Sequence, residues 1–294
     1  MHVGLAFANT GPFAEADGVV SLAVAAEDAG IESLWTVEHV IWPSSYDSEY
    51  PYASSGKMPG DKSSPIPDPL VWLSFVAAHT TKLVLGTGIV ILPERNPVIF
   101  AKEVATLSSL SRGRLQLGIG VGWLEEEFDA IGVPWPRRGA RTDEYVEAMR
   151  ALWAGDDASY DGEFVSFSDV SSNPKPAGGS VPIVIGGHSN AAAKRAGRLG
   201  DGFFPGKGSI EELREMIDVV RQTAAEHDRD ADAIEITAAH PGLFGDDPVG
   251  AAEELASVGV SRTIVPAFML LGGDGVEAKA TQIAETIVAP IADV

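Results

Sequence analysis

The chain has no cysteine, few basic residues for its number of acids, and no long apolar run. Without cysteine it can form no disulfide bond, thiolate metal site or cysteine nucleophile, so a disulfide-built secreted protein is not indicated. No apolar stretch approaches the about 20 residues of a transmembrane helix, and the N-terminus lacks the basic start of a signal peptide. We therefore expect a cytoplasmic protein that has no membrane partner.

Bases are half as numerous as acids: 21 Lys and Arg residues stand against 42 Asp and Glu residues, for a net charge of −21. Binding to a nucleic-acid backbone depends on clustered positive charge, so we expect no nucleic-acid partner. The acidity is typical of a soluble, self-repelling surface. A chain of 294 residues with 45% hydrophobic content can also bury roughly three quarters of its unfolded surface without covalent cross-links.

Short apolar runs alternate with longer segments of helical period along the whole chain. The predicted strands are Val3–Ala8, Ser33–Val37, Leu83–Thr87, Leu115–Ile119, Ile183–Ile185, Gly202–Phe204, Ile234–Ala238 and Thr263–Val265. The predicted helices are Asp17–Ala29, Pro69–Ala78, Pro97–Leu110, Thr142–Trp153, Ala191–Leu199, Ile210–His227, Pro248–Val258 and Val276–Val288. Gly30 and Gly259 directly follow helices, and Pro97 and Pro248 suit a first helical turn, which supports these boundaries.

Eight strand–helix units in a chain of this length predict an α/β fold of the (β/α)8 TIM barrel type, with residues 1–294 as a single domain. The strands are nearly continuous runs of valine, isoleucine and leucine, which is typical of a parallel sheet covered on both faces. A doubly wound open sheet is the alternative arrangement of the same units. In a barrel the chemistry takes place at the carboxyl ends of the strands, so residues directly after each strand are the candidates.

Two segments interrupt the alternation. Residues 40–69, here called the lid, follow the second strand and contain Trp42, three tyrosines and six prolines. A loop of this length in a compact domain is usually functional, and its aromatic side chains favour an ordered cover. Residues 157–182 form an insertion before the fifth strand, in which Ser159–Val165 reads as a hairpin with an Asp161-Gly162 turn. We expect this insertion to pack beside the barrel.

Glycines are unusually frequent at the end of the fourth predicted strand. The run Gly118-Ile119-Gly120-Val121-Gly122-Trp123 leaves the strand and enters an acidic helix start at Glu125. A Rossmann fingerprint requires a glycine in the sixth place, which Trp123 or Glu125 takes here, so a dinucleotide site is not indicated. Uncovered backbone N–H groups beside a helix N-terminus can hold an anionic cofactor of another shape.

The third and fifth strands end in a similar way. Gly86-Thr87-Gly88-Ile89 interrupts the third strand, which indicates a bulge or the close approach of a ligand. Gly186-Gly187-His188 turns into a helix that Ser189 or Asn190 caps, which is a possible cradle for one phosphate. The basic cluster Arg137–Arg141, which contains Arg137, Arg138 and Arg141, either pairs with nearby acids or grips an anionic cofactor tail or substrate.

The second strand ends in Glu38-His39, which places a histidine at the predicted barrel mouth. A histidine there can act as a general acid or base near neutral pH, or it only hydrogen-bonds the lid. Glu38 either shares in this chemistry or orients a loop, since neighbouring side chains diverge from a strand. His240, after the seventh strand, is a second candidate for the mouth. No histidine pair with ligand spacing occurs, so we expect no metal site.

These motifs resemble the luciferase-like oxidoreductases, and more closely their branch that uses the deazaflavin coenzyme F420. The resemblance covers nearly the whole chain and rests on ordered segments: Ala26-x-x-x-Gly30, Trp35–His39, Leu85–Ile89, Asn96-Pro97 through Ala101-Lys102 to Leu107, Gly113–Leu115 to Gly122-Trp123, Phe128, Gly132, Arg137–Arg141, Asp143-Glu144, Pro174–Pro176, Pro182–Gly187 and Gly200–Gly202. It implies a TIM barrel, usually a homodimer, that transfers a hydride between coenzyme F420 and a small organic substrate.

The resemblance also implies roles for the residues at the strand ends. The catalytic residues would be His39, near the reacting end of the ring, and Glu38 beside it. The ring would lie over a bulge whose Gly88–Ile89 peptide bond is often cis in such proteins, with Ile89 against one ring face. Gly186 and Gly187 would cradle the phosphate. The implied cofactor-binding set is Thr87, Gly88, Ile89, Gly120, Gly122, Trp123, Gly186, Gly187 and His188.

One position departs from part of this branch. Some deazaflavin sugar dehydrogenases carry an acidic glutamate directly after the glycines of strand four, where this chain has Trp123. The resemblance therefore argues against sugar dehydrogenation and gives Trp123 the role of an aromatic wall. Two alternatives stay open: an FMN-dependent monooxygenase, because FMN shares the phosphate and the ring shape, and a non-catalytic protein that binds a flavin or deazaflavin.

Overall fold

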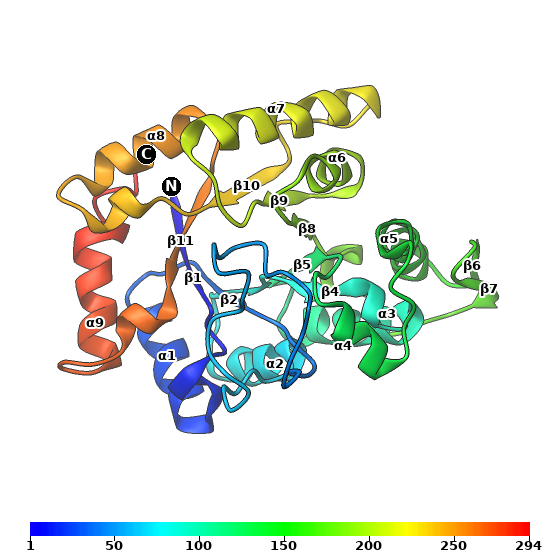
Figure 1. Ribbon diagram of the computed structural model, residues 1–294, viewed down its shortest axis with the longest axis horizontal. Helices are drawn as coiled ribbons and strands as arrows, with labels where there is room; N and C mark the ends of the chain where they lie inside the picture. The colour runs from blue at the N-terminus through cyan, green and yellow to red at the C-terminus, as the bar shows by residue number, and fades with distance from the viewer.

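The main sheet of the computed structural model, which describes residues 1–294, is a closed parallel barrel (Figure 1). Its nine strands run in the order β3-β2-β1-β11-β10-β9-β8-β5-β4, and β3 also pairs with β5, so the sheet has no open edge between them. β3 and β4 share one position in the barrel because residues 88–89 interrupt it. The structure thus has eight strand positions, which confirms the predicted barrel and excludes the open sheet.

Most element boundaries agree with the predicted ones to within a few residues. The barrel strands are β1 (His2–Ala6), β2 (Ser33–Thr36), β3 (Val84–Thr87), β4 (Val90–Ile91), β5 (Leu115–Gly120), β8 (Ile183–Gly186), β9 (Gly202–Phe204), β10 (Glu235–Ala238) and β11 (Arg262–Pro266). The helices are α1 (Ala16–Asp28), α2 (Pro69–His79), α3 (Pro97–Leu110), α4 (Glu125–Ile131), α5 (Arg138–Ala154), α6 (Asn190–Leu199), α7 (Ile210–Glu226), α8 (Pro248–Ser257) and α9 (Val276–Ile283), which a π-helical turn extends to Val288. Helix α5 begins one turn earlier than predicted.

The barrel and its helices share one hydrophobic core. Fifty-nine buried apolar residues form a single cluster to which the strands and the surrounding helices both contribute. Helix α3 shows why such a segment forms: Phe100, Val104 and Leu107 recur on its buried face, while the Asn96 side chain accepts hydrogen bonds from two N–H groups of the first turn. No helix is both long and apolar enough to cross a membrane.

The lid contains no helix or strand before Asp68, and in Figure 1 it lies as a blue loop in front of the barrel strands. The insertion forms a separate antiparallel ribbon of β6 (Ala158–Asp161) and β7 (Ser166–Val170). Its turn is wider than the predicted Asp-Gly turn and comprises residues 162–165, closed by a 3.0 Å hydrogen bond between its ends. The wider turn is stable because the Glu144 carboxylate of α5 accepts its three consecutive N–H groups, from Glu163 to Val165.

Arg262, at the start of β11, closes the amino-terminal end of the barrel. Its side chain is buried and donates two hydrogen bonds of 2.9 and 2.8 Å to Glu32, and Glu235 lies 3.3 Å away. Burial acts to raise the pKa of Glu32, but the adjacent guanidinium lowers it below its ordinary value. The network therefore joins the strands β10 and β11 to the residue before β2 through one buried cation.

We expect Arg262→Met to lower the free energy of unfolding by about 1.5–3 kcal/mol, because the partly buried Glu32 carboxylate loses two hydrogen bonds from a buried cation. Urea denaturation at pH 7 measures this change. Arg214→Met, which removes an exposed cation from α7, serves as the control and should have a small effect. Equal losses in the two variants would show that the Arg262 network does not stabilise the barrel.

Candidate functional site

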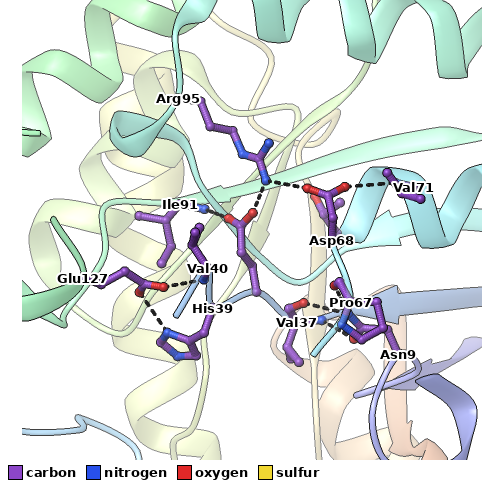
Figure 2. A network of polar contacts seen from close by, with 12 residues as sticks. Asn9, Val37, His39, Val40, Pro67, Asp68, Val71, Ile91, Arg95 and Glu127 are labelled. Carbon is purple, nitrogen blue, oxygen red and sulfur yellow. Dashed lines mark hydrogen bonds and ion pairs between the residues drawn. The ribbon is translucent and has the colours of Figure 1, made fainter. Parts of the chain in front are cut away.

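A buried carboxylate holds His39 at the carboxyl end of the barrel (Figure 2). Nδ1 of His39 lies 2.9 Å from Glu127 Oε2, and the Glu127 side chain is fully buried. Because a carboxylate only accepts hydrogen bonds, this contact places the hydrogen of the neutral imidazole on Nδ1 and leaves Nε2 available. Glu127 also accepts the N–H groups of Val40 and Ile41, the first residues of the lid. The predicted histidine is thus fixed together with the base of the lid.

Glu38 has a different set of contacts from those of its neighbour. Its buried carboxylate accepts the Ile91 N–H at 2.6 Å and pairs with Arg95, which also lies 3.3 Å from Asp68. Burial raises the pKa of Glu38, while Arg95 opposes that rise. These bonds fasten the end of β2 to β4 and to the start of α3.

The bulge between β3 and β4 contains a cis peptide bond at Gly88–Ile89, as the family resemblance implies. Thr87 Oγ1 donates to the Gly118 carbonyl at 2.7 Å, and the Gly88 N–H donates to the Thr36 carbonyl at 2.7 Å. The Ile89 side chain turns into the space beside Gly120 and Gly186, where an added Cβ would lie 2.5 Å from it. These two glycines therefore make room for Ile89.

The turn after β8 is shaped as a polar cradle. Gly187 has a positive φ of 122°, and Ser189, not Asn190, caps helix α6 by accepting the Ala192 N–H at 3.2 Å. His188 lies between them, and its Nδ1 atom is buried without a hydrogen-bond partner. Burial lowers the pKa of His188, and Lys207 adds to this effect. The cradle thus combines a helix N-terminus with an imidazole nitrogen that has no protein partner.

Trp123 is the wall against which the lid packs. Gly122 precedes it with a positive φ of 80°. The Trp123 ring meets those of His39, Tyr46 and Tyr50 edge to face, at centroid distances of 5.7, 5.8 and 5.2 Å. Such pairs contribute roughly 0.5–1.5 kcal/mol each beyond their buried area. The aromatic wall that the family resemblance implies at Trp123 is thus part of a larger aromatic cluster.

Residues from three segments, helix α4 and the turns after β1 and β9, hold the lid over the barrel. On one side, Glu126 of α4 accepts the N–H groups of Asp47 and Ser48 at 2.6 and 3.2 Å and the Ser48 hydroxyl at 2.7 Å. On the other, Lys207 after β9 donates to the Pro51 carbonyl at 2.7 Å, and Asn9 after β1 donates to the Pro67 carbonyl at 3.1 Å. The lid is therefore an ordered cover attached to the segments that follow β1, β5 and β9.

The three arginines of the basic cluster have separate roles. Arg137 pairs with Glu163 of the insertion, and Arg141 donates to the Pro134 carbonyl at 2.7 Å. Arg138 stacks 3.5 Å from the Trp135 ring centroid, and its Nε donates to the Gly122 carbonyl at 3.3 Å. Only Arg138 thus contacts a glycine at a strand end.

The buried side-chain atoms without a hydrogen-bond partner all lie at the mouth. They are Thr36 Oγ1 at the end of β2, both carboxyl oxygens of Glu94 after β4, and His188 Nδ1 after β8. Buried polar atoms in folded proteins are normally paired, so this distribution fits a polar ligand at the carboxyl ends of the strands. No group of three or more His, Asp or Glu side chains is placed to hold a metal ion.

The structure brings the predicted strand-end residues together and adds two that the sequence did not indicate, Glu94 and Glu127. Glu127 belongs to the acidic start of α4, where carboxylates are expected for the helix dipole alone. The one available signal was the number of acids: three consecutive glutamates exceed what a helix start requires. Glu94 had no signal, because a single glutamate after Pro93 is ordinary surface composition.

We expect Ser48→Ala to loosen the lid locally, because Glu126 loses the hydroxyl donor that fixes it. Hydrogen exchange of the Asp47 and Ser48 amides should become about fivefold faster, the effect of losing roughly 1 kcal/mol. Ser63→Ala, elsewhere in the lid, is the control and should leave those amides unchanged. Equal effects would show that Glu126 does not hold the lid.

The contact between Glu126 and the lid also predicts that protection of the Asp47 and Ser48 amides depends on pH. Burial opposes the shift, but the hydrogen bonds from Ser48 and Asp47 lower the pKa of Glu126 to about 2. A folded-state pKa below the ordinary value of 4.5 means that the contact stabilises the closed lid above that value. Protection of the two amides should therefore fall as the pH decreases from 4.5 towards 2, and constant protection over that range would contradict the assignment.

Comparison with known proteins places this geometry in a family. The family model described as luciferase-like monooxygenase matches residues 3–289. The F420-dependent glucose-6-phosphate dehydrogenase of Mycolicibacterium smegmatis is 37% identical over 224 residues, which are 74% of this chain and 62% of that protein. A solved F420-dependent secondary alcohol dehydrogenase in complex with an F420–acetone adduct superposes with a TM-score of 0.78 at 18% identity, covering 99% of this chain and 98% of that one.

A second solved structure shares the fold. The oxygenating constituent of 3,6-diketocamphane monooxygenase from Pseudomonas putida, in complex with FMN, superposes with a TM-score of 0.64 at 20% identity, over 81% of this chain and 67% of that one. At these identities the superpositions show a common fold. The match of the family model over nearly the whole chain shows more: the protein belongs to the luciferase-like monooxygenase family.

Proposed function

We propose that this protein is a coenzyme F420-dependent oxidoreductase that transfers a hydride between the deazaflavin and a small organic substrate. The observation that carries the proposal is the His39–Glu127 pair, which presents Nε2 of a fixed imidazole at the barrel mouth. The sequence relative named for F420 dependence supports the choice of cofactor. Trp123 beside His39 supports a substrate other than a sugar phosphate.

The residues present fit such a cofactor. The N-terminus of α6 and the unpartnered Nδ1 of His188 provide hydrogen-bonding groups for a phosphate beside the turn at Gly187. The bulge at Gly88–Ile89 would support the ring. Thr36 Oγ1, at the end of the strand that leads to His39, is buried and has no hydrogen-bond partner. When bound, the deazaflavin supplies the carbon that accepts or donates the hydride, which is chemistry that no side chain provides.

The protein's own residues then handle the proton. When an alcohol is oxidised, His39 Nε2 takes the hydroxyl proton; in the reverse direction it returns that proton to the carbonyl oxygen. The Glu127 carboxylate stabilises the imidazolium and fixes its orientation through Nδ1. Glu38 takes the orienting role, since its carboxylate is already committed to Ile91 and Arg95. The aromatic lid excludes water from the reacting atoms.

The mouth suits an uncharged substrate. Lys57 donates to the Tyr46 carbonyl, Lys207 donates to the Pro51 carbonyl, and Arg95 is paired with Glu38. These contacts turn both lysines toward lid carbonyls and neutralise Arg95, and the Trp123 ring beside His39 is apolar. We therefore propose a small alcohol or ketone with an apolar part as the substrate.

An FMN-dependent monooxygenase is the second candidate function. The structural neighbour in complex with FMN favours it, because that protein holds a flavin on the same fold. Oxygen consumption with reduced FMN, and no hydride transfer with F420, would be its signature. Binding of either cofactor without turnover would instead indicate the non-catalytic protein.

We expect His39→Ala to reduce F420-dependent turnover of a secondary-alcohol panel by at least about 100-fold, because the proton acceptor is lost. The dissociation constant for F420 should stay within about threefold of the original value, since the change removes a catalytic group and not the phosphate cradle. Absorbance of the deazaflavin measures turnover, and its fluorescence measures binding.

His240→Ala is the matched control. His240 follows β10, lies 3.3 Å from Glu254 and is distant in sequence from the proposed machinery. It should retain turnover. Unchanged turnover in His39→Ala would remove His39 from the mechanism, and equal losses in both variants would show a general disturbance of the mouth.

We also propose that the protein is a homodimer formed through the neighbouring helices α2 and α3. Val71 and Phe75 on α2 are 71% and 41% exposed, and Ile99 on α3 is 61% exposed. Large apolar side chains that are exposed on two neighbouring helices are typical of a protein interface.

The double variant Val71→Lys, Ile99→Lys should convert the dimer into a monomer, because it places four like charges in a symmetric interface. Sedimentation velocity at micromolar concentration measures the change. Val24→Lys, on the exposed face of α1, is the control and should leave the dimer intact. A monomeric unmodified protein, or a dimer that survives the double substitution, would contradict this interface.

A further inference from the structure

Asn9, three residues after β1, has a fully buried side chain at the base of the lid. Its Nδ2 donates hydrogen bonds to the carbonyl oxygens of Val37 at 2.9 Å and Pro67 at 3.1 Å, and its Oδ1 accepts the Val37 N–H at 2.8 Å (Figure 2). One N–H and two carbonyls thus face the amide, which matches its acceptor and its two donors. Because both donors are used and the side chain is not exposed, Asn9 is not placed to contact a ligand.

The two bonds to Val37 continue the pairing of β1 with β2. Phe7, directly after β1, has a positive φ of 58°, which lies outside the extended region, so the strand does not continue past it. The Asn9 side chain instead supplies a partner to both the N–H and the carbonyl of Val37, as a paired strand would. It thereby extends the ordered end of β2 to the second residue before His39.

Three consecutive residues after β2 are held by three different parts of the barrel. Asn9, after β1, binds Val37. The last N–H group of β4 binds Glu38, and the Glu127 carboxylate of α4 binds His39. Since the peptide chain passes a displacement of one residue on to the next, the position of the imidazole depends on Asn9 as well as on Glu127.

The bond to Pro67 ties the far end of the lid to the same amide. Pro67 lies near the end of the lid, whereas Val37 lies before its start. The next residue, Asp68, caps α2 and lies 3.3 Å from Arg95, the partner of Glu38. Both ends of the lid are therefore fixed to the end of β2.

We propose that Asn9 is a positioning residue for His39, and that its amide makes the orientation of the imidazole depend on closure of the lid. Without the bonds of Asn9, the end of β2 separates from the far end of the lid, and the contact between His39 and Glu127 loosens. The effect on catalysis rests on the proposed function of His39, whereas the coupling between the lid and the imidazole does not.

Histidine ¹⁵N NMR of the cofactor-free protein at pH 8 tests the proposal. In the unmodified protein, the ring of His39 should show a protonated Nδ1 and an unprotonated Nε2, because Glu127 accepts from Nδ1. Asn9→Leu, which has a similar size but no hydrogen-bonding group, should move both ring signals towards the averaged values of a freely exchanging imidazole. Unchanged His39 signals in Asn9→Leu would overturn the proposal.

Thr80→Val is the matched control. The Thr80 hydroxyl is buried, donates to the Val76 carbonyl at 2.9 Å and accepts from Arg114 at 2.9 Å, but it lies between α2 and β3, at the opposite end of the barrel. Its loss should also destabilise the protein, but should leave the His39 signals unchanged. Equal changes in the two variants would show that His39 responds to any loss of stability, which contradicts the proposal.

A second variant keeps the test possible if Asn9→Leu does not fold. Asn9→Asp preserves the shape and the acceptor for the Val37 N–H, but an ionised carboxylate has neither donor. Hydrogen exchange of the Val40 and Ile41 amides, the first of the lid, should become about tenfold faster, because bonds that hold the lid are lost. Unchanged exchange of these two amides would show that Asn9 holds only its direct partners, and the proposal would be wrong.

If hydride transfer is established, a double-mutant cycle provides the functional readout. Asn9→Leu should lower kcat by at least about tenfold, because a displaced imidazole no longer reaches the reacting proton. In the His39→Ala background the same substitution should change kcat by less than about twofold, since Asn9 acts through His39. Equal losses in both backgrounds would indicate a merely structural role and would contradict the proposal.

The NMR and hydrogen-exchange experiments contain no cofactor or substrate. Absence of F420-dependent turnover would therefore leave their results intact, so that a failure of this proposal and a failure of the proposed function are distinguishable.

Discussion

The Glu127 carboxylate is the contact on which the mouth of the barrel depends. It is fully buried, and such a charge is tolerated only where hydrogen bonds replace its lost water. The ring of His39 and the backbone of the first two lid residues supply those bonds. One side chain thereby couples the orientation of the histidine to the position of the lid. Because its neighbours Glu126 and Trp123 hold the next part of the lid, the segment after β5 serves as a single docking platform.

The bulge between β3 and β4 is the second constraint, and it explains the glycine pattern of the sequence. Ile89 enters the barrel between β5 and β8, and only glycine at positions 120 and 186 leaves room for it. A glycine after a strand is thus not by itself evidence of contact with a ligand. The evidence for a ligand is instead the gathering of unpartnered polar atoms, such as His188 Nδ1, at the strand ends.

The sequence predicts the fold well because its signals are local. Alternating apolar runs, glycines after helices and prolines in first turns define nearly every element, and α3 is predicted to the residue. It also locates His39 and the bulge, which lie at strand ends. It does not predict the partners: Glu127 is 88 residues from His39, and only the closed barrel brings them together. The wide turn at 162–165 is likewise set by a distant charge, the Glu144 carboxylate of α5.

The most direct test of the central claim is a parallel equilibrium titration of the cofactor-free protein with coenzyme F420 and with FMN. Each is followed by its ring fluorescence. The account predicts saturable binding of the deazaflavin, at least about tenfold tighter than that of FMN, which corresponds to roughly 1.4 kcal/mol. Tighter binding of FMN would contradict the proposed cofactor and favour the monooxygenase. Binding of neither would confine the conclusion to the fold.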